Sequence, residues 1–208
     1  MKTKQNNESL WRWYVVAVMA IIVFQLLLIL VSWIITSANP DTPMRSLLSS
    51  EGIRWLVGHL SDNLANKTGV WLFMLAVAYG VAKKSHIGEV FSWHRKWSYR
   101  QKFAFRITLL EVVLVVIILL YLTLTPHALL LGVTGSLSSS FWYGLVPILL
   151  TCVTVFAVTY GMFSRSFGNL NDAFDAMCDG VKVFAPLLIL FLLLSELYFS
   201  LVYVFSAV

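Results

Sequence analysis

The stretch YVVAVMAIIVFQLLLILVSWIIT, at residues 14–36, contains no charged residue. A helix of about 17–25 apolar residues crosses the hydrocarbon core of a bilayer, so this stretch predicts a transmembrane helix. Four further apolar stretches follow, at residues 68–82, 107–125, 142–163 and 183–207. The first of these four is short and needs flanking residues or a locally thinner bilayer to span. Because all five stretches are continuous and do not alternate with polar residues, they predict an all-α integral membrane protein with five transmembrane helices.

The positions of the charged residues indicate how these helices are oriented. Of the fifteen lysines and arginines, three precede the first stretch, seven lie between the second and third, and two lie between the fourth and fifth. The two remaining connections hold three and none. Lysine and arginine favour the cytoplasmic side. We therefore expect a protein of the cell inner (cytoplasmic) membrane with its N-terminus on the cytoplasmic side and its C-terminus on the outer side. This distribution also argues against nucleic acid as the reason for the net charge of +5.

The segment 44–66, which follows the first apolar stretch, is amphipathic. Its apolar side chains recur at intervals of three and four residues: Ile53, Leu56, Val57, Leu60 and Leu64. This spacing predicts a helix, with Ser49 or Ser50 as the N-cap and Glu51 in a first turn that favours acidic residues. We expect an interfacial amphipathic helix, which lies in the plane of the membrane surface or dips back into the helix bundle. It would either cover the bundle or line a substrate path.

The cytoplasmic loop predicted at residues 83–106 is basic and rich in aromatic residues. We select as candidate contacts for lipid or for a partner protein Lys83, Lys84, Trp93, Arg95, Lys96, Trp97 and Arg100. Basic and aromatic residues also occur together where proteins bind single-stranded nucleic acid. Between two membrane spans, however, tryptophans at the headgroup level and cations beside anionic lipid give the same composition. We therefore expect this loop to contact the lipid bilayer and not nucleic acid.

Two acidic residues lie inside apolar stretches, Glu111 near the start of the third and Glu196 near the middle of the fifth. A charge at the centre of a bilayer costs roughly 2.5–3.5 kcal/mol on insertion scales, so such residues are candidates for function. Both are therefore candidates for transport or for a proton or cation relay. The structural alternative is a protonated carboxyl group bonded to a neighbouring helix, or, for Glu111, a side chain that reaches the membrane surface.

The usual patterns of enzyme and cofactor sites are absent from the sequence. It contains no nucleophile elbow, P-loop or dinucleotide-binding motif. Cys152 and Cys178 form no CxxC pair, and the four histidines fall in three separate loops without the spacing of a metal site. We therefore expect no enzymatic activity, no cofactor and no metal.

Four segments carry the pattern of a known family. The segment SLLSSEGIRW at residues 46–55 is similar to an "LLS-EGL-W" pattern, and QKFAFR at 101–106 is similar to the start of a mid-chain helix in the same family. Residues 144–161 resemble a "G-VP-I…YG" helix, and residues 173–199 resemble the beginning of the helix after it. Together these segments resemble the p-aminobenzoyl-glutamate transporter (AbgT) family of the ion-transporter superfamily.

The resemblance implies an inner-membrane protein related to transporters of p-aminobenzoyl-glutamate or similar small organic anions, and a homodimer. Family members are longer and are expected to hold substrate and cation at re-entrant hairpins, for which this sequence shows no segment. The resemblance therefore implies a short form that lacks this core, a reduced scaffold or dimerisation unit beside a separate transport-core subunit. Two alternatives stay open: a complete small secondary transporter coupled through Glu196, and a non-transport protein that recruits a partner or lipid through the loop 83–106.

Overall fold

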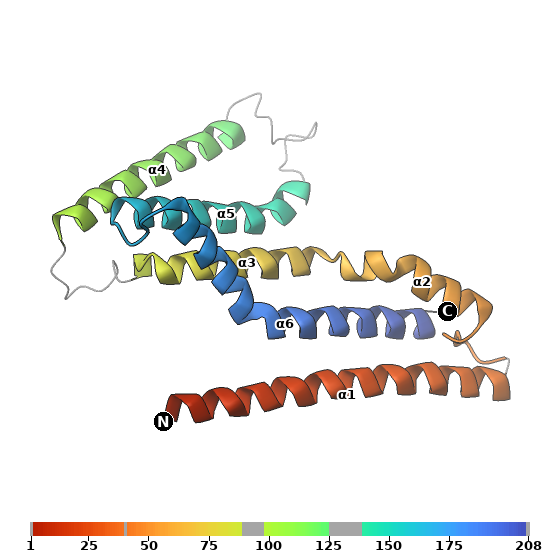
Figure 1. Cartoon of the computed structure of the whole chain (residues 1–208). Coiled ribbons are helices and arrows are strands. Elements are labelled where there is room, and N and C mark those ends of the chain that lie inside the picture. The colour runs from red at the N-terminus through yellow and green to blue at the C-terminus, as the bar shows by residue number, and fades with distance from the viewer. Residues whose placement is uncertain (1, 40, 89–97, 125–138, 207–208) are drawn as a thin grey trace. The chain divides into compact units, whose positions relative to one another are not determined.

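The computed structural model describes residues 2–39, 41–88, 98–124 and 139–206, and within these ranges the regular structure is helical (Figure 1). In chain order the helices are α1 (Lys2–Ala38), α2 (Ser50–Leu64), α3 (Lys67–Lys84), α4 (Tyr99–Leu124), α5 (Ser139–Phe163) and α6 (Leu170–Phe205). Five helical segments of this described chain are long and apolar enough to cross a membrane: Trp11–Ala38, Ser50–Lys84, Tyr99–Thr123, Tyr143–Phe163 and Leu170–Phe205. The prediction of an all-α protein with five such segments is confirmed.

Each of the five apolar stretches belongs to a helix that begins before it, and three of these helices bear on the site. Helix α4 begins at Tyr99, so Arg100 lies on a helix and not in a loop. Helix α6 begins at Leu170 and therefore carries Asp175 and Asp179, which precede the apolar stretch at 183–207. The short stretch at 68–82 is part of α3, which together with α2 forms the 35-residue segment Ser50–Lys84. The flanking residues that the stretch at 68–82 needs in order to span therefore come from the amphipathic segment.

The helices form two compact units. Unit 1 comprises the described residues of Met1–Val70 and Ala185–Val208, and unit 2 comprises those of Trp71–Phe184. Helices α3 and α6 each contribute residues to both units. The two units differ in how their helices are held together, and each is described separately.

Unit 1 is held together largely by polar contacts to α6. Its small core contains Leu47, Tyr203 and Val204. The backbone N–H of Arg45 donates to the carbonyl of Val204 at 3.0 Å, which fixes the loop before α2 on the end of α6. Gln25 on α1 donates from Nε2 to the hydroxyl of Ser200 on α6 at 2.8 Å. Hydrogen bonds between helices are typical of membrane interiors, where water is not available as a partner.

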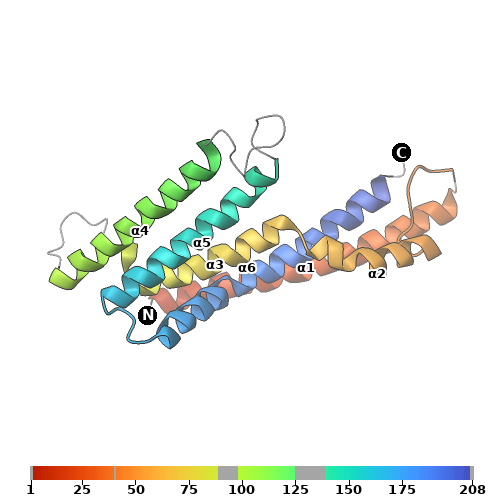
Figure 2. The ribbon, with the colours of Figure 1, turned by 90° about the horizontal axis from the view of Figure 1, so that it is seen from above.

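Helix α2 lies lengthwise along α6 in unit 1 (Figures 1 and 2). The ring of Trp55 stacks on that of Tyr203 with centroids 4.4 Å apart, and Asn63 accepts a hydrogen bond from Ser195. Eight residues separate the two contacts on each helix, which is about 12 Å of antiparallel packing. Of the two arrangements expected for the amphipathic segment, this packing favours the one in which it enters the bundle.

The apolar side of α2 faces outward. Val57 is 73% exposed, Ile53 50% and Leu60 45%, whereas Gly52 and Asn63 are buried. This orientation has a physical reason in a membrane, because lipid is as apolar as these side chains and small or polar residues gain more at helix contacts. The predicted cap is confirmed, with Ser49 as the residue whose hydroxyl accepts from the N–H of Gly52 at 3.0 Å.

Unit 2 is held together by close packing of small residues. Gly80 on α3 and Gly180 on α6 approach so closely that a Cβ atom on either would collide with the backbone of the other helix. A buried cluster of apolar residues surrounds this contact: Val81, Ala157, Phe167, Ala173 and Ala176. Helices α4 and α5 pack side by side, with the rings of Phe103 and Phe163 edge to face at 6.1 Å. The close approach of α3 and α6 at Gly80 and Gly180 needs residues with little or no side chain.

Candidate functional site at a helix break

Glu196 on α6 contacts the C-terminal end of α2. The Nδ2 atom of Asn63 donates a hydrogen bond to Oε2 of Glu196 at 3.2 Å. The hydroxyl of Ser195, the preceding residue of α6, donates to the backbone carbonyl of Asn63 at 2.8 Å. Asn63 and Ser195 are 5% and 6% exposed. Two adjacent residues of α6 thus hold one residue of α2 by both its side chain and its backbone.

The helical segment is interrupted immediately beyond this contact. Helix α2 ends at Leu64, and the N–H of Ala65 still donates to the carbonyl of Ser61 at 2.8 Å. Asn66 then starts α3, because its side-chain oxygen accepts from the N–H of Thr68 at 3.4 Å and its carbonyl accepts from Gly69 at 3.0 Å. Asparagine is among the preferred N-cap residues. The break is therefore made by a capping residue, with no glycine or proline between the two helices.

The break lies beside the middle of an apolar helix. Glu196 is near the centre of the apolar stretch 183–207, and Asn66 is near the centre of the segment Ser50–Lys84. The last carbonyl groups of a helix lack intrahelical partners and carry partial negative charge, and the first N–H groups carry partial positive charge. In discontinuous transmembrane helices such ends bind coupling cations and anionic substrate groups. The two half-helices and the carboxyl group therefore supply the elements of such a site.

Glu196 has one oxygen atom without a hydrogen bond. Its Oε1 atom is buried and has no hydrogen-bond partner among the described residues, and none of the ion pairs found there includes this side chain. A buried, incompletely bonded carboxylate is unfavourable in a membrane. A bound proton or cation would lower this cost. Within the described part of the chain, no cluster of three or more His, Cys, Asp or Glu side chains could hold a metal.

The second acidic candidate, Glu111, lies in unit 2 between α4 and α5. The hydroxyl of Thr159 on α5 donates to its Oε1 atom at 3.3 Å. Its Oε2 atom is buried without a partner among the described residues, as is the hydroxyl of Thr108 one turn earlier on α4. A carboxyl group bonded to a neighbouring helix is the structural alternative that the sequence left open. The structure does not bring Glu111 together with a helix break.

The basic candidates are only partly described. Lys83 and Lys84 form the last turn of α3, and Lys84 contacts Asp179 of α6 with Nζ and Oδ2 3.5 Å apart. Arg100 is exposed in the first turn of α4. Trp93, Arg95, Lys96 and Trp97 lie outside the described residues, so their predicted contacts with lipid or a partner stay predictions.

Asn63 is the site residue that the sequence analysis missed. A signal for it exists, since Gly52, Trp55, His59 and Asn63 recur at intervals of three and four and form a side of α2 next to its apolar residues. Small and polar residues on one side of a membrane helix indicate where it contacts another helix. The apolar side of an amphipathic helix faces the protein core when the helix is in water, but not when it is in lipid.

The helices and the buried polar contacts define a multi-pass membrane protein. Comparison with family models then identifies the class, because residues 89–203 match the AbgT putative transporter family. The match covers more than half of the chain, and the protein belongs to this family. It includes both Glu111 and Glu196 but begins after α3, so the resemblance seen at residues 46–55 stays a prediction. Searches of curated proteins and of solved structures find no match.

Proposed function

We propose that this chain carries the proton- or cation-coupling group of an AbgT-type transporter and that this group is Glu196. The observation that supports the proposal is the break between α2 and α3 beside the half-buried carboxyl group of Glu196. One oxygen of that group bonds to Asn63 and the other has no partner among the described residues. A proton or an alkali cation would occupy the second oxygen.

The coupling would act through Asn63. Its Nδ2 atom bonds to Glu196 while its carbonyl oxygen is held by Ser195 at the end of α2. A cation on Oε1 would neutralise the carboxylate. It would also be coordinated by nearby oxygen atoms, including the carbonyl groups that end α2. Loss of the cation would leave a buried charge that favours rearrangement of this contact. The substrate class taken from the family is p-aminobenzoyl-glutamate or a similar small organic anion, and the N-terminus of α3 would favour its carboxylate.

The scaffold role and the homodimer implied by the family resemblance remain proposals alongside this one. So do a separate transport-core subunit and the recruitment of a partner or lipid by the loop 83–106. The same holds for the orientation, with the N-terminus cytoplasmic and the protein in the inner membrane. In that orientation the ends of α3 and α4 that carry Lys83, Lys84 and Arg100 lie at the cytoplasmic surface. Among the described residues, no contact in either unit favours the scaffold role over coupling at the helix break.

The test is uptake of labelled p-aminobenzoyl-glutamate into liposomes that contain the purified full chain, with a proton or sodium gradient imposed. Gradient-dependent uptake is expected for the wild type, and Glu196→Gln should lower it at least tenfold because glutamine can neither bind a proton nor carry a charge. Glu111→Gln is the matched control and should retain most of the activity. If the wild type forms a stable dimer but takes up nothing under either gradient, the scaffold role is supported and coupling by this chain alone is rejected.

A further inference from the structure

A cleft of about 400 Å³ lies in unit 2 between the C-terminal end of α3 and the N-terminal part of α6. It is lined by Tyr79, Gly80, Lys83, Lys84, His86, Asp179, Gly180 and Val183. The closely packed glycines, Gly80 and Gly180, contribute no side chain to this space. The larger residues around them therefore decide what the cleft can bind.

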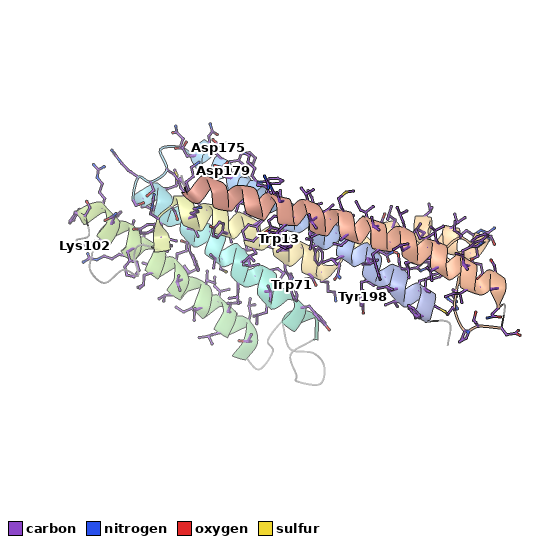
Figure 3. All side chains as sticks on the ribbon, turned by 90° about the horizontal axis from the view of Figure 1, so that it is seen from below. Trp13, Trp71, Lys102, Asp175, Asp179 and Tyr198 are labelled. Carbon is purple, nitrogen blue, oxygen red and sulfur yellow. The ribbon has the colours of Figure 1, made fainter. Side chains whose placement is uncertain are left out.

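The charged groups that line the cleft are mainly positive. Lys83 and Lys84 are accompanied by one acidic residue, Asp179. That carboxylate is shared, because Nζ of Lys84 is 3.5 Å from one of its oxygens and Nζ of Lys182 is 2.9 Å from the other. Lys83 contacts the face of the Tyr79 ring, with Nζ 5.6 Å from its centroid. Since Asp179 neutralises at most one lysine and is also engaged by Lys182, the cleft keeps an excess of positive charge (Figure 3 shows Asp179 on α6).

The cleft also has an apolar side. Val183, at which the apolar stretch of α6 begins, is 58% exposed, and Tyr79 is 41% exposed. Lys83 and Lys84, in the last turn of α3, line the same cleft as Tyr79 and Val183. The cleft therefore joins cationic side chains to an apolar surface at the point where a membrane helix leaves its polar first turns. A free ion in water would gain nothing from this apolar surface, whereas a lipid would place its acyl chain there.

We propose that this cleft binds the phosphate group of an anionic phospholipid headgroup. Lys83 and Lys84 would contact the phosphate oxygens as point charges, and Val183 and the Tyr79 ring would contact the upper part of the acyl chain. Basic pockets between transmembrane helices bind anionic headgroups on the cytoplasmic side of membranes. This site is independent of Glu196, which belongs to the other unit.

The test uses the purified full chain in detergent, titrated with dioctanoyl-phosphatidylglycerol and followed by native mass spectrometry. Lys83→Gln should weaken binding of this lipid about fivefold, because a basic residue near anionic lipid contributes about 1 kcal/mol. Lys83→Arg keeps the charge and should restore binding. Lys102→Gln is the control, since Lys102 is an exposed residue of α4 that does not line the cleft in the described structure (Figure 3).

A second variant changes the affinity in the opposite direction. Asp179→Asn removes the carboxylate that competes with phosphate for Lys84, so the lipid should bind more tightly. A variant that merely damaged the fold would not bind lipid more tightly. Dioctanoyl-phosphatidylcholine should bind at least fivefold more weakly than the phosphatidylglycerol.

Three results would overturn the proposal: equal binding of the two lipids, unchanged binding in Lys83→Gln, or equal losses in Lys83→Gln and Lys102→Gln. Inorganic phosphate provides the last arm of the experiment. If it binds with the affinity of the lipid and shows the same dependence on Lys83, the ligand is free phosphate and the lipid assignment is wrong.

Discussion

Glu196 in unit 1 and Glu111 in unit 2 are two half-buried acidic residues with nearly the same local bonding. Each accepts one hydrogen bond from a neutral side chain of another helix, at 3.2 Å from Asn63 and at 3.3 Å from Thr159. Each also has one oxygen without a partner among the described residues. They differ in the backbone that surrounds them. Asn63 precedes a helix break, whereas Thr159 lies within the continuous helix α5.

Under the proposed function, this difference separates the two acids. Beside a continuous helix, backbone carbonyl groups already accept hydrogen bonds within the helix and have little to offer an ion. Beside a break, the carbonyl groups at a helix end are available, and their partial negative charge adds to that of the carboxylate. The same type of residue with the same type of bond can therefore be structural in unit 2 and a coupling group in unit 1.

The largest effect on stability is expected from the close helix contact of unit 2. Gly80→Leu would force α3 away from Gly180 and should lower the free energy of unfolding by about 3 kcal/mol, the upper end for overpacked sites. The measurement is unfolding in mixed micelles followed by circular dichroism. Gly58→Leu in α2 is the control, because a Cβ at Gly58 meets no atom within 4 Å. Equal losses in the two variants would contradict the close contact between Gly80 and Gly180.

The two donors to the carboxyl groups provide a sharper comparison. Asn63→Leu and Thr159→Val each remove one hydrogen bond and leave a buried carboxyl oxygen unsatisfied, which should cost about 1–3 kcal/mol in either unit. Only Asn63→Leu is expected to abolish gradient-dependent uptake in liposomes, since only this residue links a carboxyl group to the helix break. Loss of uptake in both variants, at equal protein content, would show that the break does not distinguish the two acids.

The smallest expected change concerns the helix caps. Asn66→Ala removes the cap of α3 and Ser49→Ala removes that of α2, and each should lower the free energy of unfolding by about 1 kcal/mol. Asn66→Ala should also reduce uptake, because without its cap the break can close into a continuous helix. Ser49→Ala should leave uptake close to that of the wild type. Uptake is measured for both variants. If Asn66→Ala takes up substrate as the wild type does, the helix break is not required for transport.

The sequence was sufficient to predict the helices and the acids but not the contact between them. Continuous apolar stretches without alternation identified five helical segments long enough to span a membrane, because only helices and closed barrels satisfy the backbone in lipid. Glu196 was selected for its position inside one of these stretches. Separate segments were predicted at residues 44–66 and 68–82, and the break between α2 and α3 lies at their boundary. The cap formed by Asn66 and the position of this break beside Glu196 were not predicted. Which residue of α2 meets Glu196 depends on tertiary packing, and the outward direction of Val57 reverses the pattern of a helix in water.

The most direct measurement is infrared difference spectroscopy of the purified protein when a sodium or pH step is applied, because the C=O band of a protonated carboxyl group is separate from that of a carboxylate. The account predicts that the step removes a protonated-carboxyl band in the wild type and in Glu111→Gln. In Glu196→Gln this change should be missing. A band change that persists in Glu196→Gln, or that disappears only in Glu111→Gln, would contradict the assignment of Glu196 as the coupling group.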